Sequence, residues 1–162
     1  MFLSKGIYSR HCVHYFYDTN RSNFEGTIMS AHYEALIQAM VLISASDGSM
    51  EDSEIASIGQ IIRDAPVFSG FDMNQLRPIT EACAAALSQE DGLDLIVASI
   101  VDKLDTQLAE TAYAFALDIA ASDGKVAPEE MSILEMLRHS LNIDRLIAAG
   151  IERGTRARFY QP

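Results

Sequence analysis

The chain has 162 residues, 49% of them hydrophobic, and a formal net charge of −11. This length corresponds to about one domain, and the acidic balance argues against binding to nucleic acid phosphates. With only two cysteines we expect no disulfide framework, and no apolar stretch is long enough to cross a membrane, so we expect a cytoplasmic protein.

Residues 1–29 differ in character from the rest of the chain. Residues 11–17 are aromatic and β-prone, and residues 18–23 are typical of a turn. We expect an extended N-terminal arm, or a short strand, lying on the body of the protein. A homodimer in which aromatic residues 13–17 pair between chains is one hypothesis.

Residues 30–150 show the periodicity of α-helices. From Ser30 onward, apolar residues recur at spacings of three and four, which places them on one face of a helix. Glycine and proline punctuate this pattern and divide it. The sequence therefore predicts an all-α bundle of about seven helices over residues 30–150. The expected helices cover about 30–46, 51–65, 78–87, 88–104, 106–122, 128–141 and 143–149.

Several ends of these helices have specific signals. Asp72 is expected to cap a short turn, Ser88 to open the fourth helix, and Asp105 or Thr106 to open the fifth. The fifth helix is apolar nearly all round, so it is predicted to be the central buried one. Gly150 is predicted to end the last helix. Residues 151–162 then form a basic, mobile tail, for which contacts with phosphates or an acidic partner are a minor alternative.

One helix-turn-helix unit occurs twice in the sequence. Residues 43–54 return as residues 119–130, and both copies contain Ala-Ser-Asp-Gly followed by a glutamate seven residues after the aspartate. Such self-similarity predicts an internal repeat packed around a shared core. It places Asp47 and Glu54 in the first turn, and Asp123 and Glu130 in the second, at matching positions.

These four acidic residues have two readings. With the glycine at position 6 of a calcium loop, the aspartate and the glutamate fall at positions 5 and 12, but positions 1 and 3 lack side-chain oxygens. The turns are therefore not ordinary EF-hands. In the first reading Asp47, Glu54, Asp123 and Glu130 only stabilise the turns and the helix starts. In the second they bind a divalent cation, calcium or magnesium, with further oxygens from Glu51, Asp52, Glu129, carbonyls or water.

No motif for catalysis accompanies these carboxylates. The chain contains no G-x-S-x-G, P-loop, H-E-x-x-H or G-x-G-x-x-G sequence, and the four histidines show no ligand spacing. An enzyme that used the paired carboxylates for acid–base chemistry would need a pocket that shifts their titration. We therefore predict a protein that is not an enzyme.

The two turns, Ala45-Ser-Asp-Gly48 with Glu54 and Ala121-Ser-Asp-Gly124 with Glu130, resemble those of the TerB-like tellurite resistance family. The resemblance covers residues 30–150 and implies a compact bundle of about seven helices in the bacterial cytoplasm. The arm, residues 1–29, has no counterpart in the family pattern. Ala127 stands where a capping serine or aspartate is more usual, so Pro128 and Glu130 must define that helix start.

The resemblance also implies a role. It implies a part in resistance to tellurite and related chemical stress, through other stress-response proteins rather than by catalysis, with Asp47, Glu54, Asp123 and Glu130 as suspected metal ligands. A peripheral membrane complex formed through partners is compatible with it. The alternative is a metal-free protein-interaction module whose Asp-Gly turns are purely structural.

Overall fold

The structure is a computed structural model that describes residues 24–47, 50–122, 124 and 126–160. Within these residues the fold is all-α and compact, with seven α-helices and no strand, which confirms the predicted fold class. The predicted arm lies outside the described residues except for its last part, where the first helix already begins at Phe24. The helices are α1 (Phe24–Ser44), α2 (Asp52–Asp64), α3 (Leu76–Leu87), α4 (Gly92–Lys103), α5 (Thr106–Ala120), α6 (Pro128–Ser140) and α7 (Arg145–Arg158).

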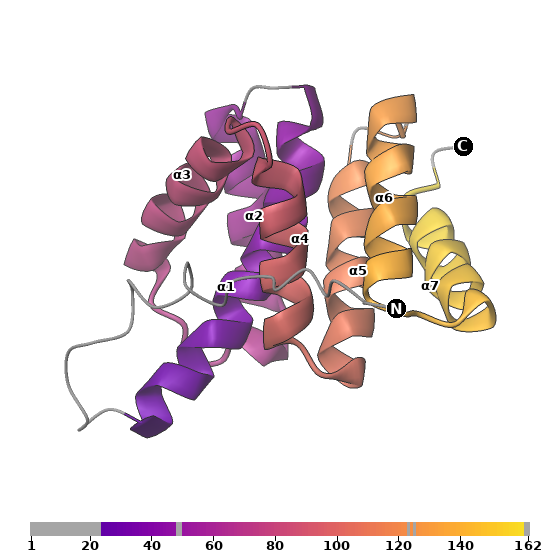
Figure 1. Cartoon of the computed structure of the whole chain (residues 1–162). Coiled ribbons are helices and arrows are strands. Elements are labelled where there is room, and N and C mark those ends of the chain that lie inside the picture. Colours follow the sequence, from indigo (N-terminus) through magenta and orange to yellow (C-terminus); the bar gives the residue numbers. More distant parts are fainter. Residues whose placement is uncertain (1–23, 48–49, 123, 125, 161–162) are drawn as a thin grey trace, which may run out of the picture.

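Helices α1 and α5 form the centre of the bundle. Helix α1 packs on α3, α4, α5 and α6, and its most extensive contact is with α5. Residues 35–44 of α1 are all buried, including the polar Gln38, whose side chain bonds to Glu34 and to Ser99 of α4. In Figure 1, α2, α3 and α4 lie with α1 on one side of the molecule, and α6 and α7 lie with α5 on the other. Over residues 35–44, α1 is thus more continuously buried than α5, because most of these residues are apolar on every side of the helix.

Local capping explains most helix starts. Asp72 accepts a hydrogen bond from the Asn74 N–H at a short 3₁₀ turn (Met73–Gln75), and Asp105 accepts one from the Leu108 N–H at the start of α5. The predicted start of α4 at Ser88 is wrong, since the Ser88 hydroxyl donates to the Ala84 carbonyl and so closes α3. Helix α4 begins at Gly92, where a Cβ atom would come within 2.0 Å of the Ala86 carbonyl oxygen, a contact that only glycine permits.

Helix α7 continues beyond Gly150, where the sequence predicted its end. It runs to Arg158, so most of the residues expected to form a mobile basic tail are helical. The reason is tertiary: the buried Thr155 hydroxyl donates to Asp118 of α5 at 3.0 Å, and Arg158 pairs with the same carboxylate. These contacts stabilise the last two turns against the low helix propensity of the two glycines in α7.

The two predicted turns connect helices as the sequence pattern requires. A 3₁₀ turn (Ala45–Asp47) follows α1 and precedes the thirteen-residue α2, while residues 121–127 join α5 to the thirteen-residue α6. The duplication itself stays a prediction. None of the helices in the described residues combines the length and apolar character that a membrane span needs.

Candidate functional site

Glu54 closes the first turn of α2. The Glu51 backbone N–H donates to the Glu54 carboxylate oxygen Oε2 at 2.6 Å, and Glu51 occupies the N-cap position. Asp52 and Glu54 both lie in the first helical turn, where the helix dipole favours negative charge. Glu54 therefore stabilises the start of α2, as the structural interpretation of the acidic turns predicts.

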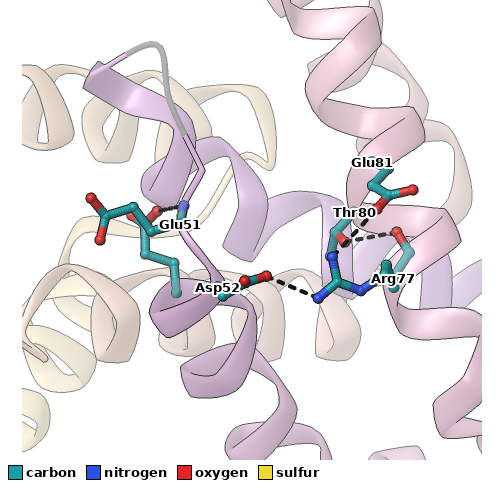
Figure 2. A network of polar contacts seen from close by, with 6 residues as sticks. Glu51, Asp52, Arg77, Thr80 and Glu81 are labelled. Atoms are coloured by element: carbon teal, nitrogen blue, oxygen red, sulfur yellow. Dashed lines mark hydrogen bonds and ion pairs between the residues drawn. The ribbon is translucent and has the colours of Figure 1, made fainter.

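The start of α2 is also tied to α3 by charge. Figure 2 shows the Arg77 guanidinium between Asp52 of α2 and Glu81 of α3, at 2.9 Å and 3.5 Å. The hydrogen bond and charge of Asp52 raise the pKa of Arg77 above its ordinary value. All three side chains are exposed, so this network orients the helix start more than it stabilises the fold. Asp52 is therefore engaged away from any cation at the turn.

Glu130 has the corresponding role in the second turn. The Ala127 N–H donates to the Glu130 oxygen Oε2 at 2.6 Å, and Pro128 is the first residue of α6. Gly124 has a backbone φ of +77°. Residues with a side chain rarely adopt this conformation, which explains the glycine in this turn. The expectation that Pro128 and Glu130 define this helix start without a capping side chain at Ala127 is confirmed.

A pocket of about 300 Å³ joins the two turns. Glu54 and Glu130, 76 positions apart in the chain, both line it and are both half-buried. The backbone of Asp47 lies in the 3₁₀ turn after α1, but its side chain is outside what the structure describes, and Asp123 is wholly outside it. We call this the acidic pocket. Its lining residues are Ser44, Glu51, Ser53, Glu54, Ser57, Ile119, Ser122 and Glu130.

Serine hydroxyls are the part of this pocket that sequence reasoning missed. Four serines line it, and Ser44, at the end of α1, is only 6% exposed. The Ser44 hydroxyl finds no hydrogen-bond partner among the described residues, and it is the one buried side-chain polar atom there of which this is true. A buried hydroxyl without a partner is costly, so a ligand or water that bonds to it would be favoured. Two sequence signals could have suggested some of them: Ser53 and Ser57 lie one helical turn apart next to Glu54, and Ser122 belongs to the repeated Ala-Ser-Asp-Gly turn.

The donor set of the acidic pocket is made entirely of oxygen atoms. Carboxylates and hydroxyls suit hard cations such as calcium and magnesium better than zinc. A carboxylate that accepts one N–H retains the capacity to coordinate an ion, because it has two oxygens with about four lone-pair sites. In the described part of the chain, however, no group of three or more His, Cys, Asp or Glu side chains is placed to hold a metal. A complete site would need Asp47, Asp123, carbonyls or water as well. Of the further donors predicted, Glu51 lines the pocket, while Asp52 and Glu129 do not.

Comparison with known proteins supports one family. The family model described as "Tellurite resistance protein TerB" matches residues 33–150, which is more than half of the chain. No curated protein and no solved structure matches the chain. The matched range contains both acidic turns and α1 from Tyr33 through α6, and ends inside α7.

Proposed function

This chain belongs to the TerB family of tellurite resistance proteins, and on that premise we propose that it is a non-enzymatic module that binds a divalent cation in the acidic pocket. The family supports a role in tellurite resistance, and the proposal extends this role to related chemical stress. The cation is the finer part of the proposal. It rests on one observation, the convergence of Glu54 and Glu130 with the unpartnered Ser44 hydroxyl in one pocket.

The physical consequence of a bound cation would be to connect the two halves of the bundle. Glu54 belongs to α2 and Glu130 to α6, so an ion held by both would tie the α1–α2 turn to the α5–α6 turn. The residues that would hold it are Glu54, Glu130 and Ser44, with Asp47 and Asp123 as the remaining candidates. When bound, the ion would neutralise carboxylates that otherwise repel each other across the pocket. The acidic surface would then be stiffer, and would be presented to partner proteins in one arrangement.

Calorimetry tests this proposal directly. We expect calcium or magnesium to bind with an enthalpy change that is lost in the Asp47→Ala/Asp123→Ala double variant and in the Glu54→Gln/Glu130→Gln double variant. Zinc serves as the comparison ion, since an all-oxygen site should not prefer it. Asp64→Ala is a matched control, because Asp64 is an exposed carboxylate at the other end of α2, outside the pocket. Unchanged affinity in both double variants would show that the ion binds elsewhere.

A second candidate function has its own support. The two 2.6 Å hydrogen bonds from the N–H groups of Glu51 and Ala127 show that both glutamates already stabilise helix starts. In a metal-free interaction module this would be their whole purpose. That function predicts no affinity for calcium or magnesium at millimolar concentrations, together with a loss of thermal stability in the same double variants.

A further inference from the structure

A second and larger cavity lies on the other side of the bundle from α2 and α3. Helices α5, α6 and α7 enclose a groove of about 570 Å³, a volume in the range of small-molecule sites. Its buried wall contains Leu117 of α5 and Leu134 of α6, and its remaining walls come from the α5–α6 turn and the end of α7. We call it the C-terminal groove. Its lining includes Tyr113, Leu117, Val126, Met131, Leu134 and Phe159.

Exposed apolar side chains gather at this groove. Ten large hydrophobic residues in the described chain are exposed, and four of them line it: Val126, Met131, Phe159 and Tyr160. A concentration of exposed apolar surface around a concave site marks a binding surface more often than isolated exposed residues do. Methionine side chains adapt to irregular apolar shapes, and aromatic side chains supply a large apolar contact area. The groove therefore offers apolar contact surface to the apolar part of a ligand.

Some polar groups of the groove already have hydrogen-bond or ion-pair partners within the described part of the protein, and others do not. The Tyr113 hydroxyl, from α5, donates to Glu152 of α7 at 2.9 Å, so this carboxylate has a partner. Glu135 is exposed on α6. The guanidinium groups of Arg138 and Arg156 form no ion pair with any described residue, and the Arg138 guanidinium lies 2.9 Å from the Nε2 atom of the neighbouring His139.

We propose that the C-terminal groove binds a small amphipathic carboxylate. Its apolar body would lie against Leu117, Leu134 and Met131, and its carboxylate would be held by Arg138 and Arg156. Arginine presents paired N–H donors that match the geometry of a carboxylate. The apolar part of the ligand would displace water from the two guanidinium groups, and an anion replaces the hydrogen bonds to that water better than a neutral or cationic group does. The choice of an anion rests on the two arginines that form no ion pair with a described residue. A cationic ligand facing Glu135 and Glu152, of which only Glu152 accepts the Tyr113 hydroxyl, is the opposite outcome that the test distinguishes. This site is separate from the acidic pocket and does not depend on a cation there.

Methyl NMR of the full chain with labelled methionine tests the proposal, using octanoate, octylamine and octanol as probes. We expect the Met131 methyl signal, assigned through Met131→Leu, to shift saturably with octanoate, with a Kd about tenfold lower than for octylamine or octanol. The Arg138→Gln/Arg156→Gln variant should lose this preference. Arg153→Gln should keep it, since Arg153 is an exposed arginine on α7 that does not line the groove.

Each other outcome overturns the proposal. If the Met131 methyl signal does not move with octanoate, the groove is not a site for this ligand class. If octylamine or octanol binds as tightly as octanoate, or more tightly, the arginines do not select the ligand by its charge. If the double arginine variant, shown to be folded by its helical circular dichroism, keeps the preference for octanoate, the assigned residues are wrong. All titrations are made in EDTA, so the result is independent of the proposed cation site.

Discussion

The Glu54→Gln/Glu130→Gln variant separates the two functions proposed for the acidic pocket. Glutamine keeps an oxygen that can accept the N–H of Glu51 or Ala127, so each 2.6 Å hydrogen bond can persist in neutral form. What is lost without a cation is the charge at two helix starts, about 0.3–1 kcal/mol each. In EDTA we therefore expect the free energy of unfolding to fall by about 1 kcal/mol, because both side chains are only half-buried.

A cation changes this comparison. An ion present at about 100 times its Kd stabilises the folded wild-type protein by about 2.7 kcal/mol. For a chain of this size, that amounts to a rise in Tm of about 5–11 °C. We expect thermal unfolding, followed by circular dichroism in EDTA and then in excess calcium or magnesium, to show this rise in the wild type and none in the variant. A variant that keeps the rise would refute the pocket as the site, and a wild type without any rise would leave only the structural function of the two glutamates.

Three further predictions concern the groove and the core. Leu137→Ala should lower the free energy of unfolding in urea by about 2–5 kcal/mol, because Leu137 is fully buried, whereas the exposed Leu146→Ala should change it by less than about 0.5 kcal/mol. Tyr113→Phe should cost about 1 kcal/mol in the same assay by removing the bond to Glu152, and Tyr160→Phe, at an exposed position, should cost nothing measurable. Burial, and secondarily the charge of Glu34, raises the pKa of Cys83 from 9.0 to about 12. The folded state therefore keeps this thiol neutral where the unfolded state ionises it. The contribution of the neutral thiol to the free energy of unfolding is complete below pH 9 and is lost as pH rises toward 12. Between pH 9 and 10.5 the wild type should therefore lose about 2 kcal/mol more than Cys83→Ala, and equal losses would contradict the shift.

Most of the fold was predictable because its signals are local. Asp72 and Asp105 cap turns through their own side chains, and Pro128 is compatible with only a few helix positions. Where prediction failed, distant contacts decided the outcome. Ser88 closes a helix instead of opening one because Gly92 must pack against the last turn of α3, and α7 passes Gly150 because Thr155 and Arg158 bind Asp118.

The acidic pocket was predictable in part for the same reason. The repeat placed Glu54 and Glu130 at equivalent positions, but only the packing of α1 against α5 brings the two turns to one pocket. Ser53, Ser57 and Ser122 carry only the local signals of spacing and repeat, and Ser44 corresponds in the repeat to Ala120, so no pattern distinguishes it. The C-terminal groove could not be predicted at all, because it depends on an α7 longer than the sequence indicated.

Ser44 provides the sharpest test of what the acidic pocket is for. If the pocket is only structural, Ser44→Ala removes a buried hydroxyl without a partner and inserts a better helix former, so stability in EDTA should stay the same or rise by about 1 kcal/mol. If the hydroxyl serves a cation, the same variant should also lower the affinity for calcium or magnesium in calorimetry. Ser132→Ala is the control, since this exposed hydroxyl donates to the Pro128 carbonyl outside the pocket. A stabilised Ser44→Ala protein with unchanged cation affinity would exclude Ser44 from the site, whereas a stabilised protein with weakened affinity would show that the fold gives up stability to keep an oxygen there for a ligand.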